Sequence, residues 1–273
     1  MPKGPAFSSC LSFIRVIRVN PWLLLLFALV LSVPIRANPR RFVRLPALCL
    51  PAMLDPARIA ELLRPFLGDT PVSAELAPQL QTYLELLLRW NTRINLTAVR
   101  APEQIVTRHF GESLFAARLL RDAGAFTSGG DARPILADVG SGAGFPGLPI
   151  KLLAPHIRLT LIESQNKKAT FLREVVRALG VKDAEVHCGR AETWKHTANV
   201  VTTRAVEKFA TILPIAARLV VPHGRLCLLA GASQVEAVSQ VLGARWNLSA
   251  PVPMPLSESR VVLMGVRAPV VAT

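Results

Sequence analysis

Four glycines within eight residues are the positions of this chain best suited to binding a ligand through the backbone. They lie in the run Asp138-Val-Gly-Ser-Gly-Ala-Gly-Phe-Pro-Gly147. Glycine lets backbone amides approach a ligand closely, because it has no side chain in the way. About 20 residues further on, Glu163 closes an apolar run, where its carboxylate could accept hydrogen bonds from ribose hydroxyls. The pattern predicts a site for a ribose-bearing cofactor, with Gly140, Gly142 and Gly144 forming the loop.

The loop alone leaves two cofactors open. Gly142-Ala-Gly144-Phe-Pro-Gly147 formally fits the dinucleotide fingerprint, which is a weak signal by itself. Asp138 places a carboxylate at the end of the preceding strand, where it would repel a pyrophosphate but attract the ammonium and sulfonium of S-adenosylmethionine. We therefore predict S-adenosylmethionine as the cofactor. The alternative, a nicotinamide-dependent oxidoreductase, would need a proton relay such as a Tyr–Lys pair, and the only tyrosine, Tyr83, lies in a helical part of the chain.

Two further polar segments follow later predicted strands. Gly189-Arg190-Ala-Glu192 comes after the third, where a loop contacting adenine would lie in such a sheet. Arg204, in Thr202-Thr-Arg204-Ala, comes after the fourth, at the position that lines the transfer site in methyltransferases acting on amines or bases. An arginine cannot act as a general base, but it can bind a phosphate or the O6 edge of guanine. We predict that Ala191 and Glu192 contact the cofactor and that Arg204 faces both cofactor and acceptor.

The helical part carries other polar residues with less specific roles. Trp90, on an apolar helix, is expected to pack in the core. His109, Glu112 and Ser113 could suggest acid–base chemistry. No sequence pattern places them near the glycine loop, so we expect helix capping or buried hydrogen bonds from them.

The elements that must position these residues divide into two regions. Residues 53–130 are predicted to be helical, with apolar periodicity in four stretches: Asp55–Leu67, Ala77–Trp90, Pro102–Phe110 and Glu112–Arg121. Residues 131–273 alternate short β-rich runs with helices, which predicts a parallel, doubly wound sheet. The expected strands are Ile135–Val139, Leu159–Ile162, Ala184–His187, Val200–Thr203, Arg225–Leu229 and Arg260–Val266. The last two could form an antiparallel edge.

The charge balance favours an anionic partner. The chain has a net charge of +14, and residues 1–54 contribute seven basic residues and no acidic one, which leaves +7 for the remainder. A basic surface attracts phosphates irrespective of sequence, so nucleic acid is a natural partner. The four cysteines, Cys10, Cys49, Cys188 and Cys227, lack metal-ligand spacing and are predicted to be reduced thiols in a cytoplasmic protein without a metal site.

Residues 1–52 form a basic and apolar leader that differs from the rest of the chain. The apolar run Trp22–Val33 is short of the about 20 residues that a membrane-spanning helix needs. The leader has some features of a targeting segment, but we favour a translation start at Met53, just before an N-cap aspartate and a first-turn proline. No stable membrane association is expected.

Several runs, taken in order, resemble one family, the bacterial 16S rRNA (guanine-N7) methyltransferase G family, also called glucose-inhibited division protein B. They are Arg89-Trp-Asn-x-x-x-Asn95-Leu-Thr-Ala98, Arg108-His109-x-x-Glu-Ser113, the glycine loop, Glu163-Ser with Lys167-Lys-x-x-Phe-Leu172, Gly189-Arg-Ala-Glu192, and Arg204-Ala. The resemblance covers about residues 55–266.

The resemblance implies an α/β fold of the class I S-adenosylmethionine-dependent methyltransferases, Rossmann-like, with an N-terminal helical extension. It implies methylation of guanine N7 in the 16S rRNA of the 30S subunit, by a protein that we expect to be monomeric. Gly140 and Phe145 would contact the cofactor, Ala191 and Glu192 would flank adenine, and Arg204 would face cofactor and base. Two residues depart from the family pattern: Ala230 stands where a lysine is usual, and Glu112 where an aspartate is usual. The lost lysine keeps open a non-catalytic RNA-binding or ribosome-assembly protein with a vestigial cofactor pocket.

Overall fold

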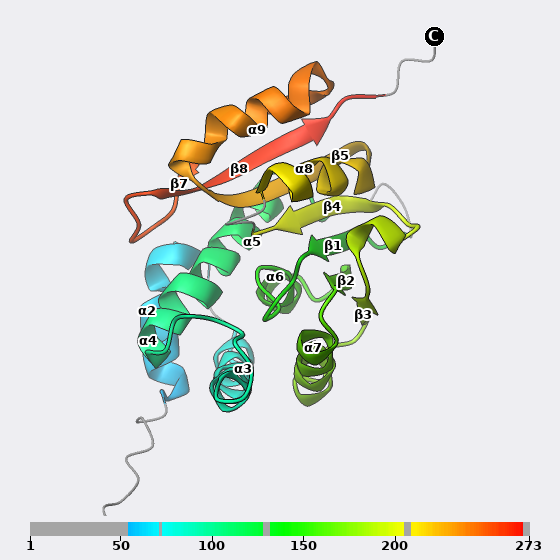
Figure 1. Ribbon diagram of the computed structural model, residues 1–273. Coiled ribbons are helices and arrows are strands. Elements are labelled where there is room, and N and C mark those ends of the chain that lie inside the picture. Colours follow the sequence, from blue (N-terminus) through cyan, green and yellow to red (C-terminus); the bar gives the residue numbers. More distant parts are fainter. Residues whose placement is uncertain (1–53, 71–72, 128–131, 205–208, 270–273) are drawn as a thin grey trace, which may run out of the picture. The chain divides into compact units, whose positions relative to one another are not determined.

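The computed structural model describes residues 54–70, 73–127, 132–204 and 209–269 (Figure 1). The leader, residues 1–52, and the expected start at Met53 lie outside these residues. The described chain begins with α2 (Pro56–Leu67), whose N-cap is the predicted one: the Asp55 carboxylate accepts a hydrogen bond from the Arg58 amide at 2.7 Å. Next comes α3 (Leu76–Asn91), and Trp90 packs edge-on against Phe171 as expected, with ring centroids 5.8 Å apart.

A continuous helical run follows and packs against α2. It consists of α4 (Pro102–Ile105), a π-helical turn (Val106–Gly111) and α5 (Glu112–Asp122). Gly111 of the π-helical turn lies close to α2, because a Cβ there would be 2.6 Å from the ring of Phe66. The sequence predicts two helices over this stretch but not the π-helical turn, whose wider winding leaves no hydrophobic period of its own. Such turns occur frequently at functional sites.

The sheet combines five parallel strands with an antiparallel end. Strands β1 (Ile135–Val139), β2 (Arg158–Glu163), β3 (Ala184–Cys188), β4 (Ala198–Thr203) and β5 (Val220–Gly231) run parallel. The order is β3-β2-β1-β4-β5-β8-β6, with β8 (Arg260–Arg267) antiparallel to β5 and to β6 (Trp246–Leu248), while β7 (Val252–Pro253) also pairs with β8. The predicted α/β, Rossmann-like doubly wound sheet with a helical N-terminal extension is confirmed.

One detail of the predicted topology is wrong. The antiparallel pairing of the last two predicted strands is confirmed, but β8 is not an edge strand, because β6 pairs with its other side. Strand β6 has three residues, which is too short for an alternating pattern to appear in the sequence.

Helices cover both faces of the sheet (Figure 1). On one face α6 (Gly147–Leu153), α7 (Asn166–Ala178) and the N-terminal helices share a single apolar core with Leu136 of β1. On the other face α8 (Phe209–Leu219) and α9 (Val235–Leu242) contribute to a second apolar core that includes Ala137 of the same strand. The helical region and the sheet therefore share one core, while the division of the chain near residue 130 stays a prediction.

The strand order reverses between β1 and β4, which lie side by side although β2 and β3 separate them in the sequence. In open α/β sheets, ligands bind beyond the carboxyl ends of the strands at such a reversal. The glycine loop leaves the carboxyl end of β1, and Arg204 leaves the carboxyl end of β4. The fold therefore brings together residues 60 positions apart in the sequence.

Candidate functional site

The glycine loop uses its glycines for two different purposes. Gly140, Gly142 and Gly144 all have positive φ, at 70°, 57° and 92°, a backbone region that other residues rarely adopt. A Cβ on Gly140 would meet nothing within 4 Å, so this residue faces open space. A Cβ on Gly144 would lie 2.3 Å from the Tyr83 hydroxyl. The loop thus offers bare backbone at one end and is tightly packed at the other.

Asp138 lies beneath the loop, with no exposed surface. Its two carboxylate oxygens accept hydrogen bonds from the Thr202 hydroxyl at 2.9 Å and from the Gly147 amide at 3.2 Å. Burial raises the pKa of Asp138 from 3.8 to about 6, against the lowering effect of these hydrogen bonds. The carboxylate thereby ties β1 to β4 and to the start of α6. Its contact with a cationic ligand stays a prediction.

Glu163, at the end of β2, holds the loop from its other side. One carboxylate oxygen accepts from the Gly142 amide at 2.9 Å, and the other accepts from the Gln165 amide at 2.7 Å. The residue is 5% exposed. A carboxylate has about four lone-pair positions, so both oxygens keep the capacity to accept a ribose hydroxyl.

A cavity of about 360 Å³ opens beside the loop, and we call it the glycine-loop cavity. Three residues predicted to contact the cofactor line it: Gly140, Ala191 and Glu192. The last two belong to a short 3-10 turn after β3, and their contact with adenine stays a prediction. The other lining residues are Val139, Ile162, Ser164, Gly189, Arg190, Thr211, Ile212 and Ile215. Its volume lies in the range of small-molecule sites.

Two roomier hollows, of about 800 and 780 Å³, lie at the opposite edge of the sheet. The larger is lined by Ile135, Arg158 and Ala184, which begin β1, β2 and β3. Ligands of parallel sheets bind at carboxyl ends rather than amino ends. The smaller glycine-loop cavity is therefore the better candidate for a cofactor.

Phe145 connects the glycine loop to the N-terminal helices. Its buried ring stacks on Tyr83, with centroids 5.4 Å apart, and on His109, with centroids 5.0 Å apart. The Tyr83 hydroxyl also donates a hydrogen bond to the carbonyl of Ala143. A cofactor contact of Phe145 stays a prediction, while its packing partners are Tyr83 and His109. Tyr83 is fully buried and bonded to the loop backbone, which leaves no exposed hydroxyl for the proton relay of the oxidoreductase alternative.

His109 is fixed by a chain of hydrogen bonds that starts at Asn91. The Asn91 side chain accepts from the Leu96 and Thr97 amides at 2.9 and 3.1 Å, and the Thr97 hydroxyl lies 2.7 Å from His109 Nε2. The Ser113 hydroxyl donates to the His109 carbonyl at 2.6 Å. The predicted buried hydrogen-bond role of His109 and Ser113 is confirmed.

Helix packing, which no sequence pattern indicates, brings the His109 ring onto Phe145 of the glycine loop. Burial first, and then the neighbouring Arg204, lower the pKa of His109 to about 3. The imidazole is therefore neutral at neutral pH and is not a proton carrier there.

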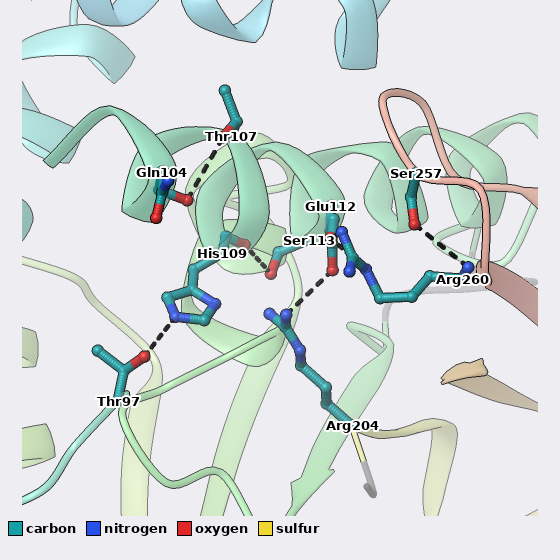
Figure 2. Close-up of polar contacts among 9 residues, drawn as sticks. All are labelled: Thr97, Gln104, Thr107, His109, Glu112, Ser113, Arg204, Ser257 and Arg260. Atoms are coloured by element: carbon teal, nitrogen blue, oxygen red, sulfur yellow. Dashed lines mark hydrogen bonds and ion pairs between the residues drawn. The ribbon is translucent and has the colours of Figure 1, made fainter. Parts of the chain in front are cut away.

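Arg204 approaches a buried carboxylate that it shares with a second arginine (Figure 2). Its Nη2 lies 3.0 Å from one oxygen of Glu112, while Nε and Nη2 of Arg260 lie 2.7 and 2.6 Å from the other oxygen. Burial raises the pKa of Glu112 and lowers the pKa of Arg204, although each partner opposes the other's shift. Both directions indicate that desolvation outweighs the mutual attraction, so stability alone does not explain the cluster.

These arginines line a second cavity, of about 380 Å³, which we call the arginine cavity. Arg108, Glu112, Arg204 and Arg260 supply its charged groups. The remaining lining residues are Leu229, Ala230, Gly231, Ser233, Gln234, Met254, Ser259 and Val261. Ala230, the departure from the family pattern, thus lies in the wall of this cavity.

Sequence reasoning found Arg204 but missed its companions in this cavity. Arg108 and Glu112 belong to one of the motifs quoted above, and their spacing of four residues on a helix is a signal that they share a face. Arg260 opens the last strand, 148 positions from Glu112, and nothing in the sequence connects the two.

Within the part of the chain that the structure describes, no three His, Cys, Asp or Glu side chains are grouped to hold a metal ion. No helix of the described ranges has the length and apolar character to cross a membrane.

Comparison with known proteins gives one consistent family. A family model described as rRNA small subunit methyltransferase G matches residues 76–249. The Ribosomal RNA small subunit methyltransferase G of Stenotrophomonas maltophilia (strain R551-3) is 37% identical over 201 residues, covering 73% of this chain and 89% of the relative. That of Roseiflexus sp. (strain RS-1) is 40% identical over 198 residues, covering 68% and 81%. The range matched by the family model contains the glycine loop, Glu163 and Arg204 but not Arg260.

Proposed function

Because this chain belongs to the rRNA small subunit methyltransferase G family, we propose that it methylates N7 of one guanine in the 16S rRNA of the 30S subunit. The sheet order and the family agree on a class I S-adenosylmethionine-dependent methyltransferase. The guanine, its N7 atom and the 30S particle are the parts of the proposal that follow from the resemblance. A substrate of this kind also implies a cytoplasmic protein, and we expect a monomer.

The glycine-loop cavity fits S-adenosylmethionine. Gly140 offers open space beside its backbone, Glu163 keeps lone pairs for ribose hydroxyls, and Ala191 with Glu192 lines the cavity where we assign adenine. Asp138 acts on the loop through its bond to Gly147 and adds negative charge near a cationic ligand. S-adenosylmethionine, when bound, supplies a methyl group carried on a sulfonium.

The acceptor chemistry asks for positioning rather than proton transfer. Guanine N7 has an available lone pair and no proton, so the chain needs no general base and must only align N7 with the methyl group. The site agrees with this, because His109 is neutral and bonded to Thr97, and the buried carboxylate of Glu112 is paired with two arginines. Arg204 is the residue that we assign to hold the guanine or a neighbouring phosphate. The base must leave its stack to reach the site, as in other enzymes that act on nucleobases.

The arrangement of the two cavities is the observation that carries the proposal. The glycine-loop cavity lies over β1 to β3, and the arginine cavity lies over β4, β5 and β8, at the same edge of the sheet. The reversal of strand order between β1 and β4 separates them. A donor site and a basic acceptor site therefore flank the point where ligands of such sheets react.

The test uses the full chain with 30S subunits from a strain that lacks this protein. We expect transfer of labelled methyl groups from S-adenosylmethionine to 16S rRNA. Mass spectrometry of the digested rRNA should then show 7-methylguanosine as the only new nucleoside. Methylation of another base, or of N1 or N2 of guanine, would contradict the acceptor assignment. Binding of S-adenosylmethionine without any transfer to 30S subunits or 16S rRNA would instead favour the non-catalytic alternative.

Replacing Arg204 with alanine tests its assigned role. We expect kcat/KM for 30S subunits to fall by about 100-fold or more, because alignment is the main catalytic contribution. The affinity for S-adenosylmethionine, measured by calorimetry, should change little by comparison. Unchanged methylation would remove Arg204 from the mechanism.

A further inference from the structure

The arginine cavity carries more positive charge than its own residues neutralise. Three arginines and one carboxylate line it, which leaves two positive charges in excess. Both oxygens of Glu112 are engaged, one by Arg260 and the other by Arg204. Arg108 is exposed and makes no ion pair with any of the residues that the structure describes. The excess charge calls for an anion from outside the chain.

The same cluster is short of hydrogen-bond partners. In the described ranges, three buried side-chain atoms lack such a partner: His109 Nδ1, Glu112 Oε2 and Arg204 Nη1. Glu112 Oε2 has the charge of Arg204 at 3.0 Å, but Nη1 of Arg204 has no acceptor. Buried polar groups are nearly always paired, and an unpaired donor on a charged group is especially costly. The cluster is therefore incomplete until an acceptor reaches Arg204.

The chemistry of the cavity selects a phosphate as that acceptor. Guanidinium groups make strong charge-assisted hydrogen bonds to phosphate oxygens, and the hydroxyl side chains of Ser233 and Ser259 are further donors in the wall. S-adenosylmethionine contains no phosphate, and the glycine-loop cavity that we assign to it shares no lining residue with the arginine cavity. The anion must then arrive with the acceptor molecule.

We propose that the arginine cavity binds a backbone phosphate of the substrate RNA, with Arg108 at its mouth and Arg204 inside. This inference rests on the proposed function, since the RNA is the acceptor molecule. Bound there, the phosphate lies at the same edge of the sheet as the methyl donor and fixes the register of the neighbouring nucleotide. Arg260 contributes charge and holds Glu112, which keeps Arg204 Nη2 occupied and leaves Nη1 for the phosphate.

Arg108→Ala is the direct test, because this exposed side chain has no structural partner to lose among the described residues. Binding of 30S subunits to the full chain is measured over a series of salt concentrations, with S-adenosylmethionine affinity measured by calorimetry. We expect 30S affinity to fall about five- to tenfold. The slope of log K against log salt should become shallower by about one, because one phosphate contact is lost. Arg108→Lys should restore the slope, and S-adenosylmethionine affinity should be unchanged in both variants.

Arg177→Ala is the matched control. Arg177 is also an exposed arginine, but it lies in the last turn of α7, towards the opposite edge of the sheet. We expect its replacement to leave affinity and slope at the wild-type values. An Arg108→Ala variant with the affinity and slope of Arg177→Ala would overturn the proposal.

Two further results separate the possible failures. If inorganic phosphate alone binds to the wild type and not to Arg108→Ala, while 30S binding is equal in both, the cavity serves a free anion and the RNA assignment is wrong. If the wild type methylates 30S subunits but Arg108→Ala behaves like wild type, the phosphate site fails and the proposed function stands. A wild type that transfers no methyl group to 30S subunits would instead remove the proposed function on which this inference rests.

Discussion

Gly144 shows that packing can require glycine as strictly as ligand access does. Its φ of 92° is unfavourable for any side chain, and a Cβ would lie 2.3 Å from the Tyr83 hydroxyl and 2.7 Å from Leu148. We expect Gly144→Ala to lower the free energy of unfolding by about 1 to 3 kcal/mol, measured by urea denaturation. We also expect it to weaken S-adenosylmethionine binding, because the loop must shift.

Tyr83→Phe supplies the control, since it removes the hydroxyl that the added methyl group would strike. The double variant should recover part of the stability that Gly144→Ala loses, because the clash with the Tyr83 hydroxyl is removed. The recovery should be incomplete, because the clash with Leu148 and the strained φ remain. Strict additivity of the two single changes would contradict this account of the contact.

Asp138 predicts a pH dependence of stability. Its pKa is about 6 in the folded chain, against an ordinary value of 3.8. The folded state thus holds the proton more tightly than the unfolded chain. The stabilisation is fully present below pH 3.8 and is lost as the pH rises through about 6, by on the order of 3 kcal/mol.

Asp138→Asn isolates this contribution from other titrating groups. An amide can accept from the Gly147 N–H and donate to the Thr202 hydroxyl, so both contacts survive without charge. Measured by urea unfolding, the variant should gain stability relative to the wild type between about pH 4 and pH 6 and keep a constant difference above that. A difference independent of pH over this range would contradict the raised pKa.

Site residues that belong to a local sequence pattern could be predicted. Site residues that come together only through folding could not. The glycine loop is a local pattern, and Glu163 and Arg204 follow from their places after predicted strands. Tyr83 and His109 reach the loop only because the N-terminal helices pack on α6 and α7. Arg260 meets Glu112 because the last strand, β8, lies between β5 and β6. No residue spacing in the sequence predicts this position.

At the scale of elements, the run from α4 to α5 connects the N-terminal region to the arginine cavity. It carries Glu112, which faces both the residue after β4 and the first residue of β8. Glu112→Gln keeps the shape and removes the charge, so it leaves two nearby arginines without their shared partner. We expect the free energy of unfolding to fall by about 3 kcal/mol. This value is at the lower end of the range for breaking a buried ion pair, because the Arg260 side chain is 30% exposed.

The same substitution should act on RNA binding in the opposite sense. It adds one positive charge to the arginine cavity, so the dependence of 30S affinity on salt should steepen, a change that a purely structural role would not produce. Glu112→Asp should recover much of the stability. Glu61→Gln, which breaks the exposed pair with Arg58, should change stability by less than about 1 kcal/mol. Equal losses of stability in Glu61→Gln and Glu112→Gln would contradict the conclusion that burial makes the Glu112 ion pairs important for stability.

Elements with a sustained hydrophobic period were predictable. Strand β1 has the bounds that the sequence indicates, and α2 starts at its predicted cap. The π-helical turn and β6 were missed, because the first differs from an α-helix only in its winding and the second is three residues long. Short elements of this kind depend on the neighbours against which they pack.

At the scale of the whole molecule, residues 50–273 form a compact unit by their internal contacts. We therefore expect a chain beginning at Met53 to fold, to bind S-adenosylmethionine within about twofold of the full chain and to methylate 30S subunits. Calorimetry and the methylation assay measure this. The shorter chain also lacks the seven basic residues of the leader, so any difference should appear in the salt dependence of 30S binding.

A shortened chain that aggregates or loses the cofactor would show that the leader is part of the folded protein. N-terminal sequencing of the natural product tests the start site directly. A first residue near Met53 supports the predicted start, and a first residue near Met1 contradicts it.

The stacking of Phe145 on Tyr83 and His109 has a consequence for how the molecule opens. The glycine loop would be expected to exchange its amide hydrogens early, as mobile binding loops generally do. Here its aromatic residue stacks on a residue of α3 and on one of the π-helical turn, and a tyrosine hydroxyl donates a hydrogen bond to its backbone. Releasing the loop therefore means disrupting the N-terminal helices as well, so the two should unfold as a single foldon, and the catalytic half should not be separable by proteolysis into a working fragment.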